Sequence, residues 1–167
     1  MSKTKDNLAE AFAGESQANR RYLAYASQAD KAGHPRIARL FRAVAEAETV
    51  HAHNHLRILG GIGSTEENLK DAIKGEHFEF KNMYPEMIEA AKQEGDTKAE
   101  RTFHFANEVE KIHHDLYQQA LNSLEKGEDQ PDVEYHVCSI CGYTHEGPPP
   151  DKCPVCSAAK KAFFKVD

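Results

Sequence analysis

Residues 48–51 read ETVH and residues 110–113 read EKIH, so the spacing Glu-x-x-His occurs twice, 62 residues apart. Residues three apart lie on one face of a helix, so the carboxylate and the imidazole of each pair point the same way. A single pair of this kind usually lies on a solvated helix face. Two copies at a fixed offset indicate a repeated helix that carries metal-ligating side chains.

Other residues repeat at nearly the same offset. Gly33 matches Gly95 and Tyr22 matches Tyr84 at 62, whereas the pair at residues 14–15 recurs at residues 75–76, an offset of 61. The first 127 residues therefore resemble two copies of one helical hairpin.

Helical periodicity and its stop signals give four long helices. They are predicted from Lys5 to Lys31, Pro35 to Gly60, Ser64 to Gly95 and Thr97 to Gly127. Ser64 and Thr97 each begin a capping-box spacing with a glutamate three residues later. Pro85 falls inside the third helix and is expected to kink it or loosen one turn.

Carboxylates interrupt the apolar stripe of every predicted helix. The five are Glu15, Glu48, Glu76, Glu79 and Glu110. Burying them at one level needs positive charge, and the stripes hold no Lys or Arg, so a pair of hard cations is the simplest answer. One Glu from each of two helices, with Glu-x-x-His from each of the other two, is the pattern of a di-iron four-helix bundle.

Two tyrosines lie about two turns beyond the first acids of the repeat. Tyr22 and Tyr84 are either core aromatics with a satisfied hydroxyl or donors of a hydrogen bond to a metal-bound carboxylate. The sequence leaves both readings open.

All four cysteines lie in the last part of the chain, after a polar linker at residues 128–134. Cys138 and Cys141 form one Cys-x-x-Cys pair, and Cys153 and Cys156 form the other. Such pairs are typical of a four-thiolate metal site, which a module as small as residues 135–167 needs in order to fold. Zinc and iron both fit the thiolates.

Bulk properties narrow the class of protein. The net charge of −6 argues against nucleic acid as a partner. No apolar run approaches the roughly 18 residues of a membrane helix. The N-terminal residues have no apolar stretch behind them, so we expect no signal peptide, no membrane partner and a cytoplasmic location.

The letters around the cysteines resemble rubredoxin, which favours iron over zinc there. They are Tyr135-x-x-Cys-x-x-Cys-Gly-Tyr, then Cys-Pro-x-Cys, then Lys160 and Phe163. Ser157 departs from this pattern, because rubredoxins usually carry Gly at this position. A left-handed backbone conformation there would cost more free energy for Ser than for Gly. With this rubredoxin-like module following the repeated helical hairpins, the whole chain resembles the rubrerythrin family.

The resemblance implies a ferritin-like di-iron domain over residues 1–127 and a rubredoxin-like iron module over residues 135–167. It implies a peroxidase that reduces hydrogen peroxide to water, with electrons from an external donor entering through the cysteine-bound iron. The alternative is a ferroxidase or iron-handling protein of ferritin type. Storage needs no one-electron donor, so the fused cysteine site favours the peroxidase.

The resemblance also assigns roles within an iron pair that is oxo-bridged when oxidised. Glu15 and Glu76 are terminal ligands, Glu48 and Glu110 bridge, and His113 binds one iron. Glu79 is an extra carboxylate expected to bind the more highly charged oxidised pair, and neutral His51 is expected to replace it on reduction. With Tyr22 and Tyr84, these two exchanging residues form the expected catalytic set.

The connection between the second and third helices is too short for one ferritin-like bundle. Glu48 and Glu76 each lie 11 residues from the helix end nearest this connection. If both glutamates lie at the same level of one bundle, the connection must span the length of both 11-residue stretches, roughly 33 Å at 1.5 Å per residue. Five residues, 60–64, reach at most about 18 Å. Unwinding of the third helix, an up-down-up-down bundle or domain swapping would resolve this. We favour a swapped homodimer with di-iron sites built from two chains.

Overall fold

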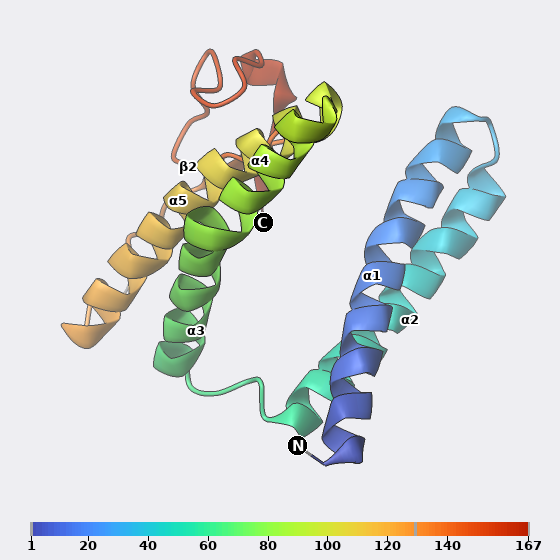
Figure 1. The fold of residues 1–167 in the computed structure, drawn as a ribbon, viewed down its shortest axis with the longest axis horizontal. Helices are drawn as coiled ribbons and strands as arrows, with labels where there is room; N and C mark the ends of the chain where they lie inside the picture. Colours follow the sequence, from blue (N-terminus) through green and yellow to red (C-terminus); the bar gives the residue numbers. More distant parts are fainter. Residues whose placement is uncertain (1, 129, 167) are drawn as a thin grey trace. The chain divides into compact units, whose positions relative to one another are not determined.

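The computed structural model describes residues 2–128 and 130–166, and its chain divides after Gly63 into two compact units. The first unit is a hairpin of α1 (Lys3–Lys31) and α2 (Pro35–Leu59), which lie side by side in Figure 1. The seam between them is formed by small residues: Ala18, Ala26, Ala38, Ala45 and Ala52 are all buried. Such small side chains let the two helix backbones approach closely.

The ends of this hairpin follow from its sequence. The hydroxyl of Ser2 accepts a hydrogen bond from the amide of Lys5, and Pro35 occupies the first turn of α2, where its missing N–H costs nothing. Gly60 ends α2 with φ at 73°, a left-handed conformation that suits glycine. At Gly61 a Cβ would overlap the terminal methyl group of Leu56, so a larger residue there would require the Leu56 side chain to move.

The second unit begins with α3 (Thr65–Phe78), a π-helical turn η1 (Glu79–Met83) and α4 (Tyr84–Glu94), all packed against α5 (Thr97–Glu125). The capping box predicted at Ser64 is confirmed, because Ser64 and Glu67 exchange both hydrogen bonds. The capping box predicted at Thr97 is wrong. Asp96 caps α5 instead, and its carboxylate accepts from the amides at positions 98 and 99.

The π-helical turn explains two features of the sequence. Pro85 has no N–H and its ring excludes a carbonyl four residues back, so the helix before it cannot stay regular. The amide of Tyr84 instead bonds to the carbonyl of Glu79, five residues back. The prediction that Pro85 loosens a turn is therefore confirmed. A π turn holds one extra residue, and the repeat offset rises from 61 to 62 between Glu76 and Tyr84.

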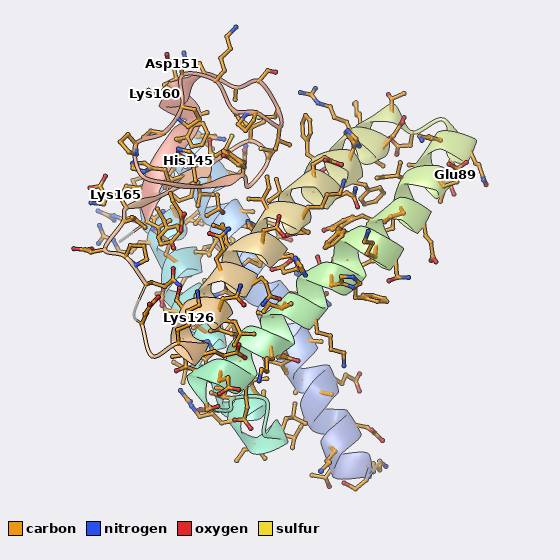
Figure 2. All side chains as sticks on the ribbon, turned by 90° about the vertical axis from the view of Figure 1, so that its left-hand side faces the viewer. Glu89, Lys126, His145, Asp151, Lys160 and Lys165 are labelled. Atoms are coloured by element: carbon orange, nitrogen blue, oxygen red, sulfur yellow. The ribbon has the colours of Figure 1, made fainter. Side chains whose placement is uncertain are left out.

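The cysteine module is a three-stranded antiparallel sheet of order β2-β1-β3. Its strands are β1 (Tyr135–Cys138), β2 (Thr144–Glu146) and β3 (Phe163–Val166), and a 3-10 turn η2 (Lys160–Ala162) precedes β3. Figure 2 labels His145, Asp151, Lys160 and Lys165 on this module. Asp129, in the predicted linker, lies outside the described residues.

The predicted fold class, helices of a four-helix bundle followed by a small sheet with a four-cysteine cluster, is confirmed. Within residues 2–128 and 130–166, no helix is long and apolar enough to cross a lipid bilayer.

Candidate metal centres

The first hairpin brings three predicted ligands together. One ligand atom from each of Glu15, Glu48 and His51 lies within 4.8 Å of the others. Nδ1 of His51 is 2.9 Å from Oε2 of Glu48, as the i, i+3 spacing on α2 predicts. Asn19 ties α1 to α2 beside this triad, because its Nδ2 donates to the carbonyl of Ala45 at 2.7 Å and to the hydroxyl of Thr49 at 2.8 Å.

The second unit holds the matching triad. Ligand atoms of Glu76 on α3 and of Glu110 and His113 on α5 also lie within 4.8 Å of one another. Nδ1 of His113 is 2.7 Å from Oε2 of Glu110. Each copy of the repeat therefore contributes one glutamate and one Glu-x-x-His pair, which is the donor set expected for half of a di-metal site.

Electrostatics in the second triad fit a cation. Burial, together with a hydrogen bond and repulsion from Glu110, raises the pKa of Glu76 to about 7. Burial alone would raise the pKa of Glu110 too, but hydrogen bonds from His113 and Glu76 hold it below its usual range. The hydrogen bond to Glu110 raises the pKa of His113. These side chains hold protons close together in the metal-free chain, and a divalent ion would take the place of those protons.

Glu79 lies on the π-helical turn and is not one of the three triad residues. Burial and the negative charge of Glu110 raise the pKa of Glu79, so its carboxyl does sense this cluster. Its assignment as a ligand stays a prediction, as does the exchange with His51.

The two tyrosines of the repeat each pack against a phenylalanine of the neighbouring helix. Burial, and then the charges of Glu79, Glu110 and Glu76, raise the pKa of Tyr84, which places its phenol in the field of the carboxylates. Tyr22 packs on Tyr25 and Phe41, with ring centroids 6.2 and 6.3 Å away, and Tyr84 packs in the matching way on Phe103 at 6.4 Å. Both tyrosines are therefore packed aromatics, and a hydrogen bond from either phenol to a metal-bound carboxylate stays a prediction.

The four cysteine sulfurs form one cluster with atoms within 4.8 Å of one another. Sγ of Cys138 lies 3.7 Å from that of Cys156, and Cys141 lies 3.5 Å from Cys153. A disulfide would need about 2.05 Å, whereas thiolates about 2.3 Å from one tetrahedral metal lie about 3.8 Å apart. The cluster therefore fits a single four-coordinate metal.

The backbone of the two knuckles suits this cluster. Burial alone would raise the pKa of Cys138, but the amides of Ile140 and Cys141 hold it below its usual range by hydrogen bonding to the sulfur. Gly142 has φ at 86° and Ser157 has φ at 62°. The left-handed conformation inferred for Ser157 is confirmed, and it does not prevent the four sulfurs from forming one cluster.

The cysteine module packs on α5 beside the second triad, a contact that the sequence did not predict. A Cβ built on Gly142 would lie 3.8 Å from Val109, which is 2 % exposed and precedes Glu110. Oγ1 of Thr144, the first residue of β2, lies 2.9 Å from Nε2 of His113. No local signal marks this contact, because its partners are 31 residues apart.

Replacing Glu76 by glutamine is expected to change how the stability of the metal-free protein depends on pH. The pKa of Glu76 in the folded chain, about 7, exceeds the ordinary glutamate value of 4.5. As pH rises from 4.5, the unfolded state gives up this proton first, so the wild type loses stability until about pH 7. The variant avoids this loss, which we put at about 1 kcal/mol after discounting for solvent screening. Denaturant unfolding at pH 5 and pH 8 measures it.

A matched control is Glu89→Gln, an exposed position on α4 that Figure 2 labels. Its pH dependence should follow that of the wild type. If Glu76→Gln also follows the wild type, the carboxyl of Glu76 does not carry a proton into the folded chain at neutral pH.

Paired carboxylate–histidine triads on repeated helical hairpins, with a separate four-thiolate site, define a non-haem metalloprotein of the di-iron carboxylate class. More particularly, the chain belongs to the rubrerythrin family. The family model "Rubrerythrin" matches residues 6–121, and the model "Rubrerythrin, rubredoxin-like domain" matches residues 136–164.

Several relatives match almost end to end. Rubrerythrin-2 of Clostridium acetobutylicum is 39 % identical over 96 % of this chain and 95 % of the relative. Rubrerythrin of Nitratidesulfovibrio vulgaris is 33 % identical over 99 % and 94 %. The structure of nigerythrin in its fully reduced, all-ferrous state matches with a TM-score of 0.59 at 33 % identity, covering 99 % of this chain and 88 % of that one.

Proposed function

We propose that this chain is a non-haem di-iron peroxidase that reduces hydrogen peroxide to water with electrons delivered through the cysteine-bound iron. The main support for this proposal is that the cysteine module packs on α5, where Thr144 contacts His113. This contact lies beside a metal-ligand triad, which suits an electron donor and serves no purpose in iron storage. The family membership supports the same reading.

The reaction takes up two electrons and two protons for each hydrogen peroxide. The O–O bond breaks, and each oxygen leaves as a molecule of water. A bound iron pair would supply both electrons, and a four-thiolate iron, which an external donor reduces, would return them one at a time. Glu15, Glu48, Glu76, Glu110 and His113 would hold the iron pair. Tyr84 keeps its phenolic proton at neutral pH, as any tyrosine with an ordinary or raised pKa does, and would donate a hydrogen bond to a nearby carboxylate.

The test uses iron-loaded protein reduced anaerobically. Metal analysis should give about three irons per chain, two on the carboxylates and one on the cysteines. Stopped-flow spectra should show that hydrogen peroxide reoxidises the protein faster than dioxygen does. Faster reaction with dioxygen, with iron accumulating beyond this complement, would support the ferroxidase alternative instead.

The assembly we propose is a swapped homodimer whose di-iron sites are each built from two chains. Its support is the connection: α2 runs to Leu59 and α3 begins at Thr65, so five residues join them. The capping box at Ser64 supports this proposal over the alternative in which the start of α3 unwinds. Each site would combine the triad of Glu15, Glu48 and His51 with the second triad of the partner subunit, in a closed two-fold dimer.

A further inference from the structure

The hydroxyl of Thr144 lies between the two kinds of metal site. Its Oγ1 is 2.9 Å from Nε2 of His113 and 3.2 Å from the carbonyl oxygen of Gly142. Gly142 directly follows Cys141, one of the four sulfur ligands. One side chain thus joins His113 of the second triad to a cysteine knuckle.

The direction of these two hydrogen bonds is fixed by chemistry. A carbonyl oxygen only accepts, so the single hydroxyl proton of Thr144 points at Gly142. The oxygen of Thr144 must then accept, and Nε2 of His113 must carry a proton. Nδ1 faces Oε2 of Glu110 at 2.7 Å and donates to it, and a metal bound within the triad would take the place of that proton on Nδ1. With that proton gone, His113 is held in the tautomer that binds a metal from within the triad.

The equivalent histidine of the first hairpin lacks this arrangement. His51 has a side chain 54 % exposed, against 26 % for His113. Among the residues that the structure describes, the ring of His51 has one hydrogen bond, from Nδ1 to Glu48 at 2.9 Å. Within the described part of its own unit, the imidazole on α5 therefore has two hydrogen-bond partners and the imidazole on α2 has one.

We propose that Thr144 is a positioning residue that fixes the tautomer and orientation of His113 and thereby makes the cysteine module part of the metal site on α5. This deepens the proposed function and rests on it, since it assigns the module's electron entrance to the metal that His113 binds. Groups that orient a metal-bound histidine are worth about 10- to 100-fold in metal affinity. Coupling of this kind is reciprocal, so metal on the cysteines should also favour metal on the triads.

The test compares Thr144→Val, which keeps the shape without the hydroxyl, with Thr144→Ser, which keeps the hydroxyl. The full chain is first given one equivalent of zinc for its cysteines and is then titrated with Mn²⁺, a metal that prefers oxygen and nitrogen ligands. Loss of the free-ion electron paramagnetic resonance signal reports binding. Thr144→Val should bind Mn²⁺ about 10-fold more weakly. Thr144→Ser and the control Thr102→Val, on an exposed part of α5, should match the wild type.

A second measurement does not depend on any variant. In zinc-loaded, ¹⁵N-histidine-labelled wild type, two-bond NMR correlations should show His113 protonated at Nε2 and bound to metal through Nδ1. Binding through Nε2, or a Thr144→Val variant with unchanged Mn²⁺ affinity, would overturn the role of Thr144. Neither measurement involves peroxide, so failure of the peroxidase proposal would be seen separately.

Discussion

Replacing Cys138 by serine is expected to stop steady-state peroxide reduction while leaving one reaction of the pre-reduced protein intact. Cys138 is buried among the four sulfurs and lies at the end of β1. A serine oxygen is a poor substitute for a thiolate, so the one-electron entrance is lost or altered. Turnover with an external reductase should fall about 100-fold or more. A single stoichiometric oxidation by peroxide should remain, because the carboxylate triads are untouched.

The control is Lys161→Ala, at an exposed position of the same module. This variant should keep its iron, its visible spectrum and its turnover. Steady-state turnover that persists in Cys138→Ser would remove the cysteine iron from the mechanism, even if the di-iron site is otherwise as proposed.

Mixing two inactive variants is expected to restore activity if the dimer is swapped. One variant lacks the carboxylates of Glu15 and Glu48, and the other lacks those of Glu76 and Glu110. Each alone has no complete site. A swapped heterodimer joins the intact first hairpin of one chain to the intact second unit of the other, and so holds one complete site. An unswapped heterodimer holds none, so differently tagged, co-expressed chains give a qualitative answer.

The same heterodimer also tests which module serves which site. The module packs on α5 of its own chain, beside Glu110 and His113. Adding Cys138→Ser to the chain that keeps Glu76 and Glu110 should therefore abolish the restored turnover. Adding it to the other chain should leave that turnover in place. Equal loss from both placements would contradict a dedicated electron entrance.

Much of the helical part could be predicted, because its signals are local. Periodicity with Gly and Pro stops predicted α1 and α2 to within two residues at each end. The triads were also predictable, since i, i+3 spacing determines which side chains share a face. The cap of α5 was missed by one residue, because Asp96 and Thr97 are both good capping residues and only backbone geometry separates them.

Contacts that join distant parts of the chain could not be predicted. Asn19 sits on the apolar stripe of α1, and nothing local showed that its amide would donate to Ala45 and Thr49 on the next helix. The contact of Thr144 with His113 depends on how a folded module packs, and sequence spacing does not contain that information. The exchange of Glu79 for His51 stays a prediction, which crystals of oxidised and zinc-substituted protein would test directly.

The π-helical turn at Glu79–Met83 also determines what kind of genetic change separates the two hairpins. In a regular α-helix, deleting one residue rotates everything beyond it by roughly 100°. A π turn already holds one residue too many, so a deletion there leaves the flanking helices facing as before. An alanine scan preserves chain length and cannot reach this state. Loss of the single codon for Glu79 would remove the fifth carboxylate and make the offset between the two copies uniform. A metal site with the extra carboxylate and one without it are therefore separated by one deletion.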